Sequence, residues 1–413
     1  MSGRPRVCLV DPYDDGHHPM YAAVYAQAFA ALGMDVWLLA PPGLLRAMPA
    51  VEEMPTTTIP WEVLRSDGQS TEPGEEISVR LWKSLGRALE AHALESNDYP
   101  DFLVLLYLDS FISELLPRAV IESSVRCRFA GLWFKPPRPL GWGSRDIAKR
   151  IIRWGRRYQS LQSPLCDAVL LLDTVGHGIG SSAGRPKIIG VPEFSVTRLP
   201  AVEPQLVTEV RRRAAGRRIC AMVGSLESRK GIRAFLQAAE TAPTDEWFFV
   251  MAGKVVWSTF DAELREAIGR LSAGPENRIL LVDQWLEDET LNAVIAVSNL
   301  LHACYENWPY SSNMLCKAAT FRVPVLAADI GYLGRTVRAY GLGLTVLSGA
   351  HMPAKFVSGF SDQVAALAER PDFQQGCNKY LAENRPEALV DALKSGLAGI
   401  FSGLTRGPKG DTQ

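Results

Sequence analysis

Short apolar runs alternate with longer amphipathic segments along most of the chain. In the first half, the apolar runs lie at 7–10, 36–40, 102–108, 128–134 and 168–172, and helix-like segments separate them. Continuous apolar strands that alternate with helices are typical of a parallel sheet covered on both faces. The first half of the chain is therefore predicted to form one α/β domain.

The same alternation restarts after a proline-rich segment at 189–204 that has little periodicity. The later apolar runs lie at 217–224, 246–253, 277–283, 299–305, 323–328 and 343–347. We place a hinge near 190–205 and expect one domain at 1–195 and another at 196–386. A helix at about 387–401 could pack back on the first domain, and the polar tail at 402–413 is expected to be frayed.

The predicted fold class is α/β, with two doubly wound Rossmann-like domains. Two such domains joined by a hinge form a cleft, which their parallel sheets are expected to face. Ligands of such sheets bind beyond the carboxyl ends of the strands. The loops that follow the strands are thus the places where chemistry is expected.

Composition narrows the function classes. With 413 residues and 47% apolar residues, the chain can bury two cores. Its net charge of −1 gives no general attraction for nucleic acid, so we expect no nucleic-acid partner, and any site for a polyanion must be local.

Features of secretion, membrane insertion and metal binding are not found in the sequence. The seven cysteines are an odd number without a Cys-x-x-Cys pair, which favours buried thiols in a reducing, cytoplasmic compartment. The first apolar run is too short for a signal peptide, and no run is long enough to span a membrane. We also expect no metal, because no stretch supplies a convincing set of ligands.

A basic pair follows the strand predicted at 218–223. Gly224 lets the backbone turn after this strand, and Arg229 and Lys230 precede Gly231, where a helix is expected to begin. The start of a helix offers free amides and a partial positive charge. Two cationic side chains beside it would complete a phosphate site. The alternative is a solvated basic turn.

A carboxylate follows the strand that ends at Tyr305. Glu306 comes next, and Ser311, Ser312 and Asn313 are predicted to open a helix. A serine there could cap the helix or leave its amide open to a diphosphate. A carboxylate at a strand end suits sugar hydroxyls and holds a fixed charge near a developing cation. The alternative is ordinary capping with one surface glutamate.

Two of the six histidines follow the first strand. His17 and His18 come directly after Gly16, which permits a close approach of backbone and ligand. Asp14 and Asp15 could pair with them. We expect the two histidines to bind a ligand or an acceptor; the alternative is a solvated loop.

A basic amphipathic segment lies at 145–161. Apolar and aromatic residues share one helical face, and the other faces carry Lys149, Arg150, Arg153, Arg156 and Arg157. One interpretation is a helix that contacts a membrane surface or an anionic acceptor. The other, which we favour, is an outer helix whose apolar stripe packs on the sheet.

These stretches resemble a known family. Three of them follow one another in the second half: GSLESRKG, a glutamate at a strand end, and a small-residue helix that leads to VPVLAADIGYLGRTV. Together they resemble the donor-binding domain of retaining GT-B glycosyltransferases of the glycosyl-transferase group 1 family. GHHPMY resembles the glycine loop of the acceptor domain of that fold. The resemblance covers roughly 218–347 well and 7–40 loosely.

The resemblance implies an activity. The domain at 196–386 would bind a nucleotide-diphosphate sugar, and the domain at 1–195 would face the acceptor. The sugar would pass to an acceptor hydroxyl or amine with retention at the anomeric carbon. No metal cofactor is implied.

Individual roles also follow from the resemblance. Arg229 and Lys230 match the basic pair that holds the nucleotide diphosphate, with Gly224 and Ser225 beside them in the donor site. Glu306 matches the first acid of the family's Glu-x7-Glu motif, which faces the donor sugar. Backbone amides that meet the phosphates are expected at Ser311, Ser312 and Asn313. Across the cleft, the residues expected against the donor or the acceptor are Gly16, His17 and His18.

The sequence departs from the family at the second acid of the motif. Lys317 stands there when counted back from Pro324, and Met314 when counted forward from Glu306. A lysine cannot accept a hydrogen bond from the nucleotide ribose, but it could reach a phosphate. The missing acid leaves a second function class open, a GT-B shell that binds a ligand or activates a partner without transfer. A GT-B epimerase or phosphorylase is a third.

Two further departures concern basic residues. Ser225 follows Gly224 where many relatives carry arginine. The histidine often found after a central strand of the first domain is absent, and His17 or His18 could replace it, with His18 as the candidate catalytic residue.

Overall fold

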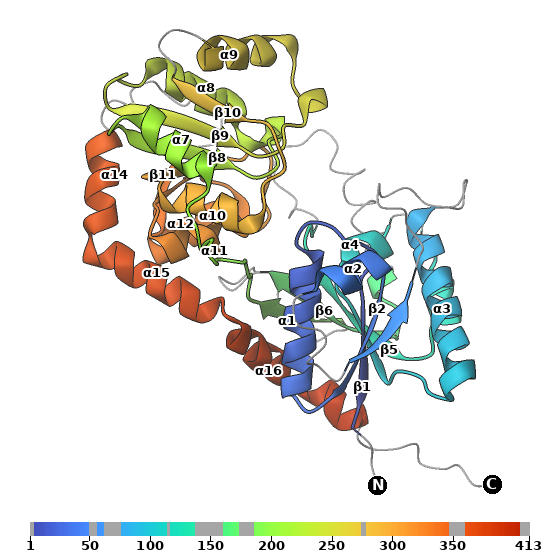
Figure 1. Ribbon diagram of the computed structural model, residues 1–413. Helices are drawn as coiled ribbons and strands as arrows, with labels where there is room; N and C mark the ends of the chain where they lie inside the picture. Colours follow the sequence, from blue (N-terminus) through green and yellow to red (C-terminus); the bar gives the residue numbers. More distant parts are fainter. Residues whose placement is uncertain are drawn as a thin grey trace, which may run out of the picture. The chain divides into compact units, whose positions relative to one another are not determined.

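The computed structural model describes residues 4–48, 56–61, 76–113, 116–136, 160–172, 186–273, 278–346 and 360–404. They form two compact units (Figure 1). The first unit contains Met1–Pro192 and Arg385–Gln413, and the second contains Glu193–Asn384. The chain therefore passes between the units twice, at 192–193 and at 384–385.

The first unit is built on a seven-stranded sheet in which each strand runs parallel to its neighbours. Its strands are β1 (Arg6–Val10), β2 (Asp35–Ala40), β3 (Thr56–Pro60), β4 (Phe102–Leu105), β5 (Arg128–Trp133), β6 (Cys166–Leu172) and β7 (Lys187–Val191). Their order across the sheet is β3-β2-β1-β4-β5-β6-β7. Every residue of β4 and β6 is buried, as expected for strands between two helical layers.

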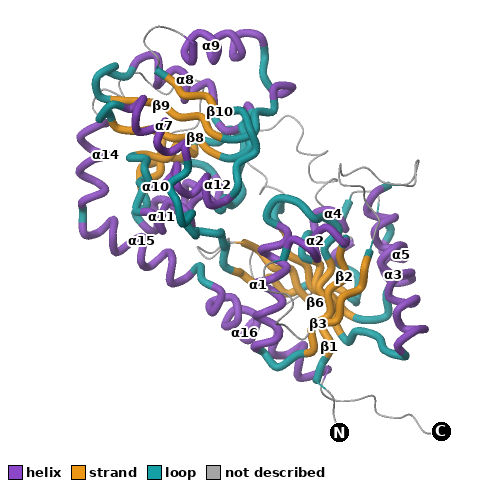
Figure 2. Tube along the Cα trace, viewed as in Figure 1, coloured by secondary structure: helices purple, strands orange, loops and turns teal. Residues whose placement is uncertain are grey.

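Helices lie on both sides of this sheet (Figure 2). They are α1 (His18–Ala31), α2 (Pro42–Ala47), α3 (Ile77–Ser96), α4 (Leu108–Phe111), α5 (Arg118–Ser124) and α16 (Pro386–Leu404). On one side α1 packs on α2 and α16, and on the other α3 packs on α4 and α5. The fully buried Trp82 of α3 anchors its side, because its ring lies 5.4 Å from Phe111 and 5.1 Å from Phe129.

The last helix of the chain belongs to the first unit. α16 contacts both α1 and β7. It runs to Leu404, past the start of the tail predicted to fray at 402, because its apolar face has a partner to pack on. Residues 405–413 lie outside the described part, as does the amphipathic segment at 145–161 except for Ser160 and Leu161.

The second unit holds a six-stranded sheet, again with parallel neighbours throughout. Its strands are β8 (Arg218–Val223), β9 (Trp247–Ala252), β10 (Ile279–Val282), β11 (Leu300–Ala303), β12 (Val325–Ala328) and β13 (Gly343–Val346). Their order is β10-β9-β8-β11-β12-β13. The predicted fold class, two doubly wound α/β units with parallel sheets, is confirmed.

Two helical layers cover the second sheet. Its helical segments are α7 (Gln205–Ala214), η2 (Ser228–Lys230), α8 (Ile232–Thr241), η3 (Trp257–Thr259), α9 (Ala262–Ala273), α10 (Asp288–Ala296), α11 (Met314–Phe321), α12 (Gly331–Tyr340), α14 (Phe360–Glu369) and α15 (Pro371–Glu383). α8 packs on α9, whereas α10 packs on α7 and α11, and α15 packs on α11, α12 and α14. None of the helices in the described ranges is both long and apolar enough to cross a membrane.

Candidate functional site

The strand order of the second unit brings two loops to the place where ligands bind in open α/β sheets. β8 lies between β9 and β11, so the chain leaves β8 toward one edge of the sheet and leaves β11 toward the other. Ligands bind at such a reversal, beyond the carboxyl ends of the strands. The loops at this reversal are 224–231 after β8 and 304–313 after β11.

Glycine is required where the ends of β8 and β9 meet. Gly224 has a φ of +87°, in the left-handed region that favours glycine. A Cβ atom on Gly253, the residue after β9, would lie 2.0 Å from the Gly224 carbonyl oxygen. A Cβ atom on Gly224 would lie 3.1 Å from the Lys230 ammonium. Gly224 thus forms the turn that the sequence predicts, with a cation directly above it.

Lys230 is buried although it is charged. It is 7% exposed, and its ammonium donates a hydrogen bond to the Val223 carbonyl oxygen at 2.8 Å and lies 5.7 Å from the centroid of the Tyr305 ring. Burial, followed by the charge of Arg229, lowers the pKa of Lys230 to about 7, against the opposing charge of Glu227. A multiply charged anion would stabilise the charged form of this ammonium in place of the water it has lost.

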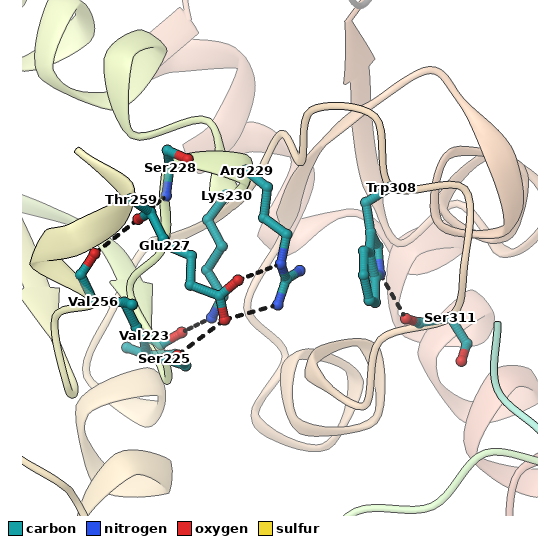
Figure 3. A network of polar contacts seen from close by, with 10 residues as sticks. All are labelled: Val223, Ser225, Glu227, Ser228, Arg229, Lys230, Val256, Thr259, Trp308 and Ser311. Carbon is teal, nitrogen blue, oxygen red and sulfur yellow. Dashed lines mark hydrogen bonds and ion pairs between the residues drawn. The ribbon is translucent and has the colours of Figure 1, made fainter. Parts of the chain in front are cut away.

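The Arg229 guanidinium lies between a carboxylate and an indole ring (Figure 3). Its Nε and one terminal nitrogen donate to Glu227 at 2.7 and 3.2 Å, and its Cζ lies 4.1 Å from the centroid of the Trp308 ring. Burial raises the pKa of Glu227, but the hydrogen bond and charge of Arg229 outweigh it, so the net shift is downward. Ser225, predicted beside the donor, is exposed and donates to Glu227 at 3.1 Å. A diphosphate would therefore share Arg229 with Glu227.

The two loops are joined through their backbones as well. The Glu306 amide donates to the Arg229 carbonyl oxygen at 2.6 Å, while the Glu306 side chain is exposed. Three residues that the sequence places in separate loops, Arg229, Lys230 and Glu306, are thus brought together at one reversal of the sheet.

The serines do not cap the helix that follows them. α11 begins at Met314 with Asn313 at the capping position, and no side chain caps it. The prediction that Ser311 or Ser312 caps this helix is wrong, because the helix starts too late for either side chain to reach its first free amides. Burial, the larger effect, raises the pKa of the Glu193 carboxyl group to about 8, and Ser311 and Ser312 act against burial and lower it.

Lys317 is not available to a phosphate. It is 2% exposed, and its ammonium donates to the Val196 carbonyl oxygen at 2.8 Å, to Asp288 Oδ1 at 2.7 Å and to Asn292 Oδ1 at 2.8 Å. All three donors of the ammonium are used. The prediction that Lys317 reaches a phosphate is therefore wrong, because this side of α11 faces α10 and the 193–198 segment, where a buried charge needs partners.

The first unit has a strand-order reversal of its own. β1 lies between β2 and β4, so the loops after β1 and β4 flank it. Aromatic rings from these loops meet there, with the Tyr13 and Tyr107 centroids 5.4 Å apart and the Tyr13 and Ser110 hydroxyls 2.7 Å apart. Phe134, which follows β5, lies 5.3 Å from Tyr107.

Asp11 and His18 form a buried pair at this reversal. His18 Nδ1 lies 2.9 Å from the carboxylate of Asp11, which is fully buried and also accepts the Tyr13 amide at 3.1 Å. Burial lowers the pKa of His18, but the charge and hydrogen bond of Asp11 outweigh it, and the net shift is upward. The carboxylates of the expected partners, Asp14 and Asp15, act on the His18 ring through longer-range charge, and the Asp15 carbonyl oxygen accepts the His18 amide at 3.3 Å. Pairing at Nδ1 leaves Nε2 as the nitrogen that can act on a ligand.

His17 stacks on His18 but is held neutral. The two ring centroids are 5.0 Å apart with the planes at 14°. Burial, followed by the charges of His18 and Lys135, lowers the pKa of His17 to about 4. Its Nε2 is buried without a hydrogen-bond partner among the described residues. Gly16 has a φ of +59°, and a Cβ atom there would meet nothing within 4 Å, so the turn itself explains this glycine.

Comparison with known proteins identifies the fold. No protein-family model and no curated protein matches the chain. A sucrose-phosphate synthase structure from Thermosynechococcus elongatus matches 97% of this chain and 100% of its own, at 17% identity and a TM-score of 0.66. HepE from Anabaena, solved with UDP and glucose, matches 96% and 100% at 12% identity, with a TM-score of 0.63. An α,α-trehalose-phosphate synthase (UDP-forming) from Burkholderia vietnamiensis matches 97% and 99% at 13% identity, also with a TM-score of 0.63.

All three structures align over nearly the full length of both chains, so the likeness includes both sheets. The chain has the GT-B fold. At identities of 12 to 17% the likeness establishes the fold, and the side chains at the two strand-order reversals carry the argument for chemistry.

Several side chains at the two reversals of this GT-B chain were not predicted. Asp11 directly follows the first apolar run. The pattern that indicates Glu306, a carboxylate at the end of a strand, also indicates Asp11. Glu227 and Trp308 have no such signal, because their contacts with Arg229 depend on how two loops meet. Glu193 lies in the proline-rich segment that the sequence predicts to be a hinge.

Proposed function

We propose that this chain is a glycosyltransferase that takes its sugar from a nucleotide-diphosphate sugar. The sugar passes to a hydroxyl or amine of the acceptor, with retention at the anomeric carbon and without a metal ion. The observation that carries the proposal is the meeting of Lys230, Arg229 and Glu306 at the β8–β11 reversal, beside the start of α11.

The two cations suit the leaving group. In glycosyl transfer from such a donor, negative charge accumulates on the departing diphosphate, and preorganised cations stabilise it most where water is excluded. Lys230 is buried, and its lowered pKa shows that burial works against its charge. A diphosphate would provide the missing counter-charge, while Arg229 can turn part of its planar donor set from Glu227 to a phosphate oxygen.

The exposed carboxylate suits the sugar. As the bond from the anomeric carbon to the diphosphate oxygen breaks, the ring gains cationic character, and Glu306 offers a fixed negative charge and two hydrogen-bond acceptors. We propose that the acceptor oxygen or nitrogen attacks the same face that the diphosphate leaves. The acceptor's proton then passes to an oxygen of the departing diphosphate.

The first unit would bind the acceptor. Its reversal combines the Asp11–His18 pair with the rings of Tyr13 and Tyr107, and we assign to His18 Nε2 the contact with the acceptor group that reacts. We also propose that the chain works in the cytoplasm. All seven cysteines are free thiols and six of them are buried, as is usual in a reducing compartment.

A thermal-shift screen with UDP-, GDP-, ADP- and TDP-sugars tests the function. A ligand at a hundred times its dissociation constant adds about 2.7 kcal/mol to the free energy of unfolding, so the right donor should raise the melting temperature clearly. Turnover with that donor should fall by about ten- to a hundredfold in Lys230→Met, since a charge-assisted hydrogen bond is worth about 1.5–3 kcal/mol. The exposed Lys379 of α15 supplies the control, because Lys379→Met removes a cation from the same unit. Wild-type turnover in folded Lys230→Met would refute the role of this residue.

One observation favours a second function. The position of the family's second acid is occupied by Lys317, which serves the packing of the second unit and not a ligand. We therefore keep as an alternative a GT-B protein that binds a nucleotide and acts on a partner without transfer. Binding of a nucleotide sugar without release of the nucleoside diphosphate, over a broad set of acceptors, would support this alternative.

A further inference from the structure

The Arg229 guanidinium has an acceptor within its own loop. Its Nε atom donates to Glu227 Oε2 at 2.7 Å and its Nη2 atom to Glu227 Oε1 at 3.2 Å, so one edge of the planar group is bound to both carboxylate oxygens. Glu227 Oε1 also accepts the Ser225 hydroxyl at 3.1 Å. Carboxylates and phosphates accept from a guanidinium in the same two-point geometry, so Glu227 occupies a position on Arg229 that a phosphate could take.

The pair of Arg229 and Glu227 is charged and only partly buried. Burial raises the pKa of Glu227, but the hydrogen bond and charge of Arg229 outweigh burial, so Glu227 is ionised at physiological pH. The Arg229 side chain is 33% exposed and that of Glu227 28%. Water screens a pair at this depth more than a fully buried one, which makes the pair weaker. A diphosphate, which carries more negative charge than one carboxylate, can therefore replace Glu227 on the guanidinium.

An indole ring holds the guanidinium from another direction. Arg229 Cζ lies over the ring of Trp308, 4.1 Å from its centroid. The indole is fixed in turn, because its Nε1 donates to the Ser311 carbonyl oxygen at 3.2 Å and its ring meets that of Tyr310 edge to face, with the centroids 4.9 Å apart. Stacking uses the face of the guanidinium and leaves the N–H groups at its edges free to change acceptor. The guanidinium can thus keep its place beside Trp308 while its anionic partner changes (Figure 3).

The two cations of this loop are held differently. The Lys230 ammonium donates to the Val223 carbonyl oxygen at 2.8 Å, whereas Arg229 is bound to a carboxylate. A diphosphate that contacts both cations must loosen the pair of Arg229 with Glu227. Part of the favourable free energy of its contact with Arg229 is lost in this exchange, so an unpaired guanidinium would bind the diphosphate more tightly.

We propose that Glu227 competes with the diphosphate for Arg229, as a built-in counter-ion that weakens binding of the diphosphate product, and that Trp308 holds the guanidinium in place during the exchange. This inference rests on the proposed function. Both residues act through Arg229, so neither is a catalytic residue. Removal of the Glu227 charge should tighten diphosphate binding, whereas loss of a carboxylate that only braced Arg229 for the ligand would weaken it.

Calorimetry with nucleoside diphosphates tests the competition. UDP, GDP, ADP and TDP are titrated into the full-length wild type at pH 6, below the pKa of about 7 of Lys230, so that this neighbour is mostly charged. The diphosphate that binds should bind Glu227→Gln about three- to tenfold more tightly, an effect between those of an exposed and a buried charge pair. Glu227→Ala, which also removes the acceptor, should bind at least as tightly. Glu263→Gln removes a charge that pairs with Arg233 in the same unit, and should bind within about twofold of wild type.

Salt and a second pair of variants separate competition from other effects. General repulsion between a carboxylate and a diphosphate should vanish at 0.5 M salt, where the Debye length is about 4 Å, whereas a contact competition is screened much less, so Glu227→Gln should still bind more tightly than wild type. Trp308→Leu, which removes the ring, should bind the diphosphate about three- to tenfold more weakly. Trp308→Phe keeps a ring face for the guanidinium and should restore binding to within about twofold of wild type.

The outcomes separate this inference from the proposed function. Unchanged or weaker diphosphate binding in Glu227→Gln, or a gain that disappears at 0.5 M salt, would overturn the role of Glu227 while the donor site stands. Wild-type affinity in Trp308→Leu would overturn the role of Trp308. If the wild type binds none of the four diphosphates, the proposed function itself fails, and this inference with it.

Discussion

Replacing a buried lysine of the second unit by methionine should lower stability at Lys317 but lower ligand affinity at Lys230. Lys317→Met keeps the apolar stem and removes the ammonium, which leaves Asn292 Oδ1 without its donor in the interior, whereas the Val196 carbonyl oxygen keeps the hydrogen bond from Asn292 Nδ2 at 3.0 Å. An unsatisfied buried acceptor costs about 1–3 kcal/mol. The third partner, Asp288, has a side chain that is 54% exposed and can return to water, so its share is small. The expected loss is about 2 kcal/mol, or about 4–8 °C in melting temperature for a unit of this size.

Lys230→Met should leave stability almost unchanged. Within the described ranges its ammonium makes one hydrogen bond, to a backbone carbonyl oxygen, and its lowered pKa means that burial of the charge already works against folding. We expect a change within about 1 kcal/mol. Diphosphate affinity should instead fall by about ten- to a hundredfold, whereas folded Lys317→Met should bind like wild type.

Thermal and urea unfolding of the two variants measures the first effect, and calorimetry with a nucleoside diphosphate measures the second. Lys379→Met is the control for both. Two results would refute these expectations. Lys317→Met could melt at the wild-type temperature, or it could stay folded and bind the diphosphate as weakly as Lys230→Met does. Either result would mean that the lysine at the motif position serves the ligand after all.

Two further predictions concern protons. A diphosphate at Lys230 should raise the pKa of this side chain above about 7, so binding at pH 8 should take up a proton and diphosphate affinity should fall as pH rises above 7. Calorimetry in buffers of different ionisation enthalpy measures the proton uptake. If no proton is taken up, the phosphates bind elsewhere. His302 is 3% exposed and meets Phe235 edge to face, with the ring centroids 5.3 Å apart, and burial lowers its pKa to about 4. Since the unfolded chain binds this proton below about pH 6.5 and the folded chain only below about 4, stability should be complete above pH 6.5 and fall by up to about 3 kcal/mol between 6.5 and 4. His302→Leu should flatten this part of the stability profile in urea titrations; an unaltered slope would mean that other groups cause it.

Most of the fold could be predicted because its strands are unbroken apolar runs. β8 spans Arg218–Val223, at the predicted 218–223, β5 and β9 lie within predicted runs, and β6 begins two residues before the predicted run at 168–172. Two strands were missed. β3 is rich in threonine and lies at the edge of its sheet, where a strand needs no continuous apolar run. β7 (Lys187–Val191) overlaps the start of the segment predicted to be a hinge, and its burial depends on α16 from the far end of the chain.

The site could be predicted only as far as strand ends determine it. Arg229, Lys230 and Glu306 lie together because the carboxyl ends of β8 and β11 are neighbours, a consequence of topology. The structural role of Lys317 could not be predicted by counting along the motif, because its hydrogen bonds depend on which side of α11 faces α10. The partner of His18 proved to be Asp11, since the end of a buried strand fixes a carboxylate more firmly than an exposed loop does.

The proposed function depends on a diphosphate site formed by Lys230 and Arg229, and one calorimetric series tests this site most directly. UDP, GDP, ADP and TDP are titrated into wild type, Lys230→Met and Lys379→Met at pH 7. We expect at least one diphosphate to bind wild type and Lys379→Met alike, and to bind Lys230→Met about ten- to a hundredfold more weakly at an unchanged melting temperature. Equal affinity in all three proteins, or no binding to the wild type, would contradict it.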